Sequence, residues 1–293
     1  EKIFLTLSKL QKKIKNIEII YIDNNSTDKS YKFLKEKIVN LQNTTLLKTS
    51  KRYGQGPGIG RNLGVRKSMA EYILYLDADD SLEIKNFKKL INFLDKNNSN
   101  LIYLKKKAEQ ASAPFLEYNK KKLKLYFTRT NNMEVISILF KKKFLLKNKI
   151  YFFSKIYEDI FYLFKCHFFN DAKISYYPKV IYYKYFNKNS ITNSKPSTTQ
   201  LESKFNAWKN IDQFVRKNLS KSIYNKLLFS VQFWWRGHLA NEFIKIQESS
   251  LSEAEKKPLI NWIIKNYRKH IYMKFKAITV KDKLAKYVLE LDY

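Results

Sequence analysis

The residues best suited to chemistry are two aspartates in alternate positions, Asp77 and Asp79, which follow an apolar stretch and precede Asp80. At the end of a strand such carboxylates can converge on one hard divalent cation, because Mg²⁺ and Mn²⁺ prefer oxygen ligands and bridge phosphates. The ion would neutralise the charge that develops on a departing nucleoside diphosphate. The alternative is a strand-to-helix turn whose acidic residues cap the next helix, which is the role expected of Asp80.

Strand and helix patterns alternate along the first third of the chain. The pattern predicts helices over 1–15, 61–70 and 84–94, and strands near 17–22, 45–47, 72–76 and 101–104. Such alternation indicates right-handed βαβ units and a mainly parallel sheet, in which ligands bind beyond the carboxyl ends of the strands. Two of those ends carry polar clusters, over 23–28 and 77–80, and Ser26 in the first cluster is the predicted N-cap of a helix. The sequence therefore predicts a site at these two strand ends.

Three motifs occur in order along this region. They are Ile-Asp-Asn-Asn-Ser-Thr-Asp at 22–28, Gly-Arg-Asn-Leu-Gly at 60–64, and the strand with its acidic end at 72–80. Over roughly residues 1 to 190 the chain resembles the family-2 inverting glycosyltransferases with a GT-A fold, of the kind that assemble bacterial glycans. Three ordered motifs are far more specific than any one of them.

The resemblance implies the roles of individual residues. It places Asp23, Asn24, Arg61 and Asp77 at the donor and gives Asp77 and Asp79 to a divalent metal, Mn²⁺ or Mg²⁺. The family often has a second aspartate where this chain has Asn24, whose amide can both donate and accept hydrogen bonds to a base.

A further acidic pair follows in Tyr-Glu-Asp-Ile-Phe at 157–161. It resembles the family's Glu-Asp motif, whose aspartate is the general base, and the resemblance gives that role to Asp159. The reaction needs such a group, because an acceptor hydroxyl must lose its proton as it attacks the anomeric carbon. The alternative is a surface acidic pair among lysines.

The fold implied by the resemblance is α/β: a GT-A domain (nucleotide-diphospho-sugar transferase) with a mixed, mainly parallel sheet flanked by helices. We expect this catalytic domain over 1–195, with its first strand preceding Glu1, and a C-terminal α-helical extension over 196–293. The segment 105–149 is basic and irregular. In the extension, the aromatic stretch from Phe233 to Trp235 with Arg236 admits three interpretations: an interfacial membrane helix, a dimer interface, or a core of its own.

The charge of the chain is strongly basic, with 57 lysines and arginines against 26 aspartates and glutamates, a net charge of +31. Such a charge attracts nucleic acid, anionic lipid or diphosphate-bearing substrates, although a Lys-rich coding bias would give the same composition. Cys166 is the only cysteine, so no disulfide framework is predicted. We expect a cytoplasmic protein, with the inner face of the cell membrane as an alternative location.

The sequence predicts a metal-dependent inverting glycosyltransferase. The donor would be a UDP-hexose carrying glucose, galactose or an N-acetylhexosamine, and the acceptor a hydroxyl of a glycan, free or lipid-linked. One alternative is a basic nucleic-acid-binding protein, although the scattered basic residues and the lack of a recognised motif lead us to expect no nucleic acid. The other is a non-catalytic relative that binds glycans.

Overall fold

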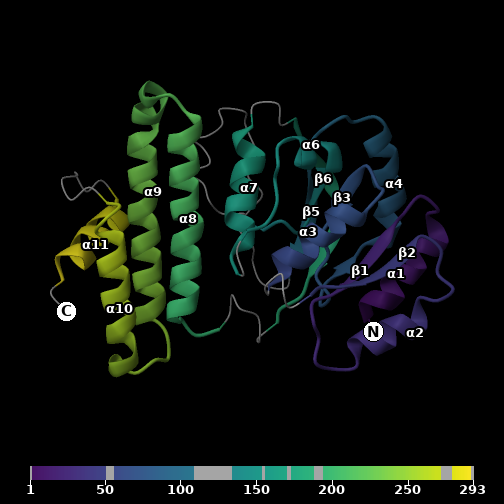
Figure 1. Cartoon of the computed structure of the whole chain (residues 1–293), viewed down its shortest axis with the longest axis horizontal. Helices are drawn as coiled ribbons and strands as arrows, with labels where there is room; N and C mark the ends of the chain where they lie inside the picture. The colour runs from purple at the N-terminus through teal and green to yellow at the C-terminus, as the bar shows by residue number, and fades with distance from the viewer. Residues whose placement is uncertain are drawn as a thin grey trace. The chain divides into compact units, whose positions relative to one another are not determined.

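The chain divides into two compact units, and the first of them ends at Asn187. The computed structural model describes residues 2–50, 56–108, 134–153, 156–169, 173–187, 194–271 and 279–291. Strands and helices make up the first unit, whereas the second is helical throughout its described part (Figure 1). The division lies close to the domain boundary predicted at residue 195, which stays a prediction.

The chain begins with a helix, α1 (Lys2–Lys13), followed by strand β1 (Ile19–Asp23), α2 (Ser30–Lys37) and β2 (Thr44–Lys48). The two strands pair in parallel, with Ile19 opposite Thr44. The helix α1 turns Phe4, Leu7 and Leu10 into the core, which is the face that its apolar spacing predicts. The next helix, α3 (Pro57–Lys67), begins with a proline at its first position, one turn earlier than the sequence pattern predicts.

A five-stranded sheet forms the centre of the unit, in the order β3-β6-β5-β7-β4. Its strands are β3 (Tyr72–Leu74), β4 (Ser81–Leu82), β5 (Leu101–Ala108), β6 (Ile138–Lys141) and β7 (Ile174–Lys184). The helices α4 (Ile84–Asp95), α6 (Lys142–Lys147) and α7 (Glu158–Phe168) connect them.

The predicted class, an α/β fold with helices flanking a mixed sheet, is confirmed. The balance of strand directions, counted over the two-stranded sheet β1-β2 and the five-stranded sheet, differs from the prediction. Of the five strand pairings in the described part of the chain, β1–β2 and β5–β7 are parallel and three are antiparallel. The reason is that β4 and β6, two short strands that the sequence pattern did not reveal, run against their neighbours.

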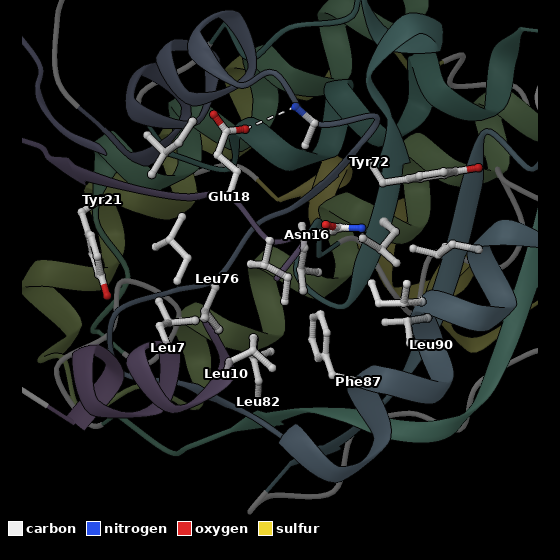
Figure 2. Close-up of a pocket in the computed structure, with 18 of the residues that line it drawn as sticks. Leu7, Leu10, Asn16, Glu18, Tyr21, Tyr72, Leu76, Leu82, Phe87 and Leu90 are labelled. Carbon is white, nitrogen blue, oxygen red and sulfur yellow. Dashed lines mark hydrogen bonds between the residues drawn. The ribbon is translucent and has the colours of Figure 1, made fainter. Parts of the chain in front are cut away.

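A large cavity lies between β1 and β3, with a volume of about 1070 Å³. Figure 2 shows Tyr21 of β1 on one side and Tyr72 of β3 on the other, with Leu10 of α1 and Phe87 of α4 along the same space. Where described, β1 pairs only with β2 and β3 only with β6, so the strand edges at this cavity have no neighbouring strand.

The second unit contains α8 (Thr198–Asn218), α9 (Lys221–Gln247), α10 (Glu253–Tyr267) and α11 (Val280–Glu290). Each helix begins at a side-chain N-cap, supplied in turn by Ser197, Ser220, Ser252 and Thr279. These caps accept from backbone N–H groups that the first turn leaves without partners. In Figure 1 the helices α8, α9 and α10 lie side by side.

The aromatic stretch of α9 fills the core of this unit. Trp235 is completely buried and Trp234 nearly so, and Arg236 pairs with Asp282 of α11 at 2.6 Å. Phe205 of α8 contacts Trp235 at 5.5 Å between ring centroids. Of the three interpretations of this stretch, a core of its own is therefore confirmed for Trp234, Trp235 and Arg236. Among the helices described, none is long and apolar enough to cross a membrane.

Candidate active site

The helix α3 approaches the segment before α7 very closely. A Cβ atom on Gly58 would lie 2.6 Å from the Cβ of Phe152, a contact that only glycine avoids. One residue after Arg61, the Asn62 side chain donates to the Phe152 carbonyl at 2.8 Å and accepts from its N–H at 2.9 Å. These contacts fix the start of α3 against Phe152 and so determine where the Arg61 side chain lies.

Arg61 is the centre of the site. Its Nη2 donates to Asp77 at 3.0 Å and its Nη1 donates to Glu158, so one guanidinium bridges two of the predicted motifs. The cation also lies 5.8 Å from the ring of Tyr75 and 5.6 Å from that of Phe152. The two carboxylates keep the Arg61 pKa above its usual value although burial acts in the opposite direction.

The acidic pair lies in the first turn of α7, where negative charge is favourable to the helix. The preceding residue, Tyr157, has a left-handed backbone with φ 55°, and this turn aims Glu158 at Arg61. Glu158 is buried and Asp159 is partly exposed. Loss of solvation, followed by repulsion from Glu158, raises the Asp159 pKa to about 8, and Arg61 only partly offsets this.

The three aspartates after β3 differ in their surroundings. Asp77 accepts from Arg61 through Oδ1, and Asp79 accepts from Asn187 through Oδ2 at 2.9 Å. Asp80 is buried, where its carboxylate accepts from the Tyr182 hydroxyl at 2.6 Å and from the Tyr185 N–H at 3.0 Å. The prediction that Asp80 caps a helix is wrong, because it binds the end of β7 while Glu83 caps α4.

The predicted donor residues at the end of β1 lie in a different set of contacts. Asp23 is buried and accepts from the Ser26 N–H at 3.2 Å. Asn24 donates to the Gly56 carbonyl at 3.1 Å and accepts from the Thr49 hydroxyl at 2.8 Å. The structure therefore brings Arg61, Asp77 and the acidic pair of α7 together. It joins Asn24 to the residue before α3, and no described contact joins Asp23 or Asn24 to Asp77.

The sequence did not single out Glu134 and two lysines of the same region. Glu134 accepts from Lys106 of β5 at 2.5 Å and from Lys184 of β7. Its charge is one of the influences that raise the Asp159 pKa, so this group belongs to the electrostatic surroundings of the acidic pair. No sequence signal could have found Glu134, which lies in the region predicted to be irregular.

The acidic turn offers the oxygen ligands that Mg²⁺ and Mn²⁺ prefer. Asp77 Oδ2 and Asp79 Oδ1 have no partner among the described residues, so each carboxylate has an oxygen available. Within the same part of the chain, no group of three histidine, cysteine, aspartate or glutamate side chains forms a ready-made site. The residues present fit a cation that a nucleoside diphosphate helps to hold.

Comparisons with known proteins identify the family of the chain. The sequence model of glycosyl transferase family 2 matches residues 4–154, which is more than half of the chain, and the chain belongs to this family. It is 37% identical over 92 residues to an uncharacterized glycosyltransferase of Haemophilus influenzae, covering 31% of this chain and 36% of that protein. It is 32% identical over 169 residues to the poly(ribitol-phosphate) beta-N-acetylglucosaminyltransferase TarP of Staphylococcus aureus, covering 54% of this chain and 51% of TarP.

The chain thus spans about half or less of the length of these relatives. Among solved structures it is similar to residues 1–349 of S. aureus TarS in complex with UDP-GlcNAc. The TM-score is 0.69 at 17% identity, over 99% of this chain and 86% of that one. The predicted family-2 glycosyltransferase with a GT-A fold is confirmed.

Proposed function

We propose that this glycosyltransferase moves a hexose from a UDP-sugar to a hydroxyl of a glycan acceptor, with inversion at the anomeric carbon. UDP-GlcNAc is the first donor to test, because the similar TarS structure holds it and TarP is named for transferring N-acetylglucosamine. A Bacillus spizizenii relative, 32% identical over 84 residues, is named a poly(ribitol-phosphate) beta-glucosyltransferase, so UDP-glucose is the second.

The observation that carries the proposal is the bridge made by Arg61. Arg61, Asp77 and Glu158 come from three separate segments, and the guanidinium of Arg61 binds both carboxylates. We assign Asp77 and Arg61 to the donor, and the acidic pair that begins at Glu158 supplies the proposed base. Surface acidic pairs among lysines have no reason to converge in this way.

The mechanism is a single displacement. Asp159, once ionised, accepts the proton of the acceptor hydroxyl, and the hydroxyl oxygen forms a bond to the anomeric carbon. The bond from that carbon to the diphosphate oxygen breaks on the opposite face, and UDP leaves with the electron pair. Arg61 holds Asp77 and Glu158 in place during this step, so the chain contributes orientation and electrostatics rather than a covalent intermediate.

Asp77 and Asp79 would hold a divalent metal through the carboxylate oxygens that remain available. A bound Mg²⁺ or Mn²⁺ supplies charge neutralisation for the diphosphate. Asp23 and Asn24 are proposed to contact the donor from the end of β1.

The proposed acceptor is a glycan or polyol polymer, free or lipid-linked, and TarP and TarS suggest poly(ribitol phosphate) as the first one to test. The net charge of +31 suits a polyanionic acceptor and contact with an anionic membrane face. A cytoplasmic location at that face belongs to the proposal.

The decisive experiment incubates the chain with UDP-GlcNAc, Mn²⁺ and poly(ribitol phosphate) and follows both UDP release and label transfer. Inversion predicts a β-linked product from the α-linked donor. If mixed oligonucleotides bound tightly and UDP-GlcNAc did not, a nucleic-acid-binding protein would replace this proposal. Tight glycan binding without transfer or donor hydrolysis would instead identify a non-catalytic relative.

A further inference from the structure

Lys106, Glu134 and Lys184 form a charged cluster at the ends of two neighbouring strands. Lys106 lies near the end of β5, and Lys184 is the last residue of β7. The two strands run parallel. Both lysines therefore lie at the carboxyl edge of the sheet, which is where parallel sheets bind their ligands.

The register of the two strands explains why the lysines converge. Lys106 lies opposite Tyr182, and Ala108 lies opposite Lys184. Because side chains alternate between the faces of a sheet along each strand, Lys106, Tyr182 and Lys184 all leave the same face. Tyr182 reaches the acidic turn from that face, since its hydroxyl donates to Asp80 at 2.6 Å. The charged cluster therefore lies on the face of the sheet that carries the candidate active site.

The charged cluster also lies close to the proposed base and to a proposed metal ligand. The negative charge of Glu134 is near enough to Asp159 to contribute to its raised pKa. Shortly after Lys184, the side chain of Asn187 donates to Asp79 at 2.9 Å. An extended acceptor whose hydroxyl lies at Asp159 can therefore reach the charged cluster with a neighbouring unit.

The three side chains carry two positive charges against one negative charge. Lys106 donates to Oε2 of Glu134 at 2.5 Å, and Lys184 donates to Oε1, so one carboxylate lies between two ammonium groups. Although loss of solvation acts to raise it, the two lysines keep the pKa of Glu134 below its usual value, and the carboxylate is ionised at neutral pH. One positive charge is left over within the cluster, which makes it attractive to a further anion.

Stability alone does not account for this arrangement. The Lys106 side chain is only 10% exposed, but those of Glu134 and Lys184 are 36% and 38% exposed. Ion pairs that are open to solvent typically contribute about 0–1 kcal/mol, because holding long side chains in one geometry costs conformational entropy. Two converging lysines at the ligand-binding edge of a sheet are better suited to hold an anion from solution.

We propose that Lys106 and Lys184 form a subsite for one phosphate group of the acceptor, and that Glu134 occupies this subsite while the acceptor is absent. The inference rests on the proposed function and names the part of the acceptor that is recognised beyond its reacting hydroxyl. Poly(ribitol phosphate), the first acceptor proposed for this chain, carries a phosphodiester in every repeat. That phosphate replaces the carboxylate between the two ammonium groups, while a hydroxyl of the same polymer lies at Asp159.

The test measures binding of a fluorescently labelled ribitol-phosphate oligomer to the full chain by anisotropy, without donor. A salt concentration of about 150 mM screens the scattered surface lysines. Lys106→Gln and Lys184→Gln keep most of the side-chain stem and remove the charge, and each is expected to weaken binding by about tenfold. Lys35→Gln, at an exposed lysine of α2, is the matched control and should change the affinity by less than about twofold.

Glu134→Gln separates the proposal from a purely structural role, because the two predict opposite signs. If the carboxylate competes with the phosphate, its removal should tighten oligomer binding by about threefold or more. Weaker or unchanged binding by a folded Glu134→Gln would overturn its place in the subsite. Because Lys184 is 38% exposed, Lys184→Gln provides the lysine test even if Lys106→Gln does not fold.

Two further outcomes would overturn the subsite. One is equal oligomer affinity in the wild type, Lys184→Gln and Lys35→Gln; label transfer from UDP-GlcNAc by the wild type would still support the proposed function. The other is a loss of UDP affinity in Lys184→Gln, measured by calorimetric titration with Mn²⁺, while oligomer affinity stays unchanged. That result would assign the lysines to the donor diphosphate. A wild type that binds neither UDP nor the oligomer would contradict the subsite and the proposed function together.

Discussion

Arg61 of α3 donates a hydrogen bond to Glu158 at the start of α7, across 97 residues of sequence. Both side chains are largely buried, and the same guanidinium binds Asp77. A buried pair of this kind is poor evidence for added stability, but removing one partner leaves an uncompensated charge. The bridge therefore makes the geometry of the acidic pair depend on a residue in the first third of the chain.

Replacing Arg61 with alanine leaves Glu158 buried without its cation and Asp77 without its partner. We expect a loss of roughly 3–5 kcal/mol in the free energy of unfolding of the first unit. Arg61→Lys should recover little of it, because an ammonium cannot reproduce the planar fork that reaches two carboxylates. Urea unfolding at pH 7 measures both variants.

The control for this prediction is Arg66→Ala, which removes an exposed arginine from the same helix. It is expected to change the free energy of unfolding by less than about 0.5 kcal/mol. If Arg61→Ala were as stable as Arg66→Ala, the bridge would contribute nothing to the free energy of unfolding.

The sequence predicts the parts of this fold that local pattern determines. The helices α1 and α4 and the strands β1, β2, β3 and β5 lie where apolar periodicity places them. It misses β6, because a strand of four residues is too short to carry a periodic signal. It also places an N-cap at Ser26, whereas α2 begins at Ser30. The Asp23 and Asp28 carboxylates accept from the Ser26 and Ser30 N–H groups, and these turns delay the helix.

The candidate site was predictable as a set of motifs and not as a set of contacts. Nothing local to Arg61 indicates that it binds Glu158, since that pairing depends on the close approach of α3 to Phe152. The burial that raises the Asp159 pKa likewise depends on side chains distant in sequence.

Replacing Asp159 with asparagine removes the proposed base while keeping the size of the side chain. We expect transfer to fall by about 10²–10⁴-fold, the usual contribution of general base catalysis, with UDP-GlcNAc affinity unchanged.

Because the pKa of Asp159 is about 8, wild-type transfer should rise with pH by about tenfold per unit below pH 8. Initial rates between pH 5.5 and 9 test this, and the variant should lose the acidic limb. Near-normal transfer by a folded Asp159→Asn would refute the assignment.

The same group makes stability depend on pH. In the folded chain the Asp159 pKa is raised from 3.8 to about 8, so between those values the folded state holds a proton that the unfolded state releases. The contribution of this group is therefore greatest near pH 4 and is lost as pH rises to 8. Asp159→Asn carries no such charge and should melt higher than wild type at pH 8, by roughly 2–4 °C per kcal/mol recovered, and nearly equally at pH 4. Glu36→Gln, at an exposed glutamate of α2, should show no such trend.

Metal dependence is expected to follow the acidic turn. Asp77→Asn and Asp79→Asn each remove a charged oxygen ligand, and each should raise the Mn²⁺ concentration needed for half-maximal transfer by about tenfold or more. EDTA should abolish transfer by the wild type, and added Mn²⁺ should restore it. Calorimetric titration of Mn²⁺ in the presence of UDP separates binding from catalysis. Asp95→Asn, an exposed aspartate at the end of α4, is the control, and full activity in EDTA would contradict a metal role.

Gly58 tests the packing that positions Arg61. An alanine methyl there would lie 2.6 Å from the Phe152 Cβ and 3.1 Å from the Glu158 Cγ, so α3 must shift away from α7. We expect Gly58→Ala to destabilise the chain by about 1–3 kcal/mol, although alanine has the higher helix propensity, and to lower transfer as well.

Gly237→Ala in α9 is the matched control: its methyl would meet no atom within 4 Å, so propensity alone should stabilise by about 0.5–1 kcal/mol. Opposite signs in urea unfolding would show that the close approach, and not the loss of glycine itself, decides the effect. A neutral Gly58→Ala would mean that α3 and Phe152 are less tightly opposed than the contact distances require.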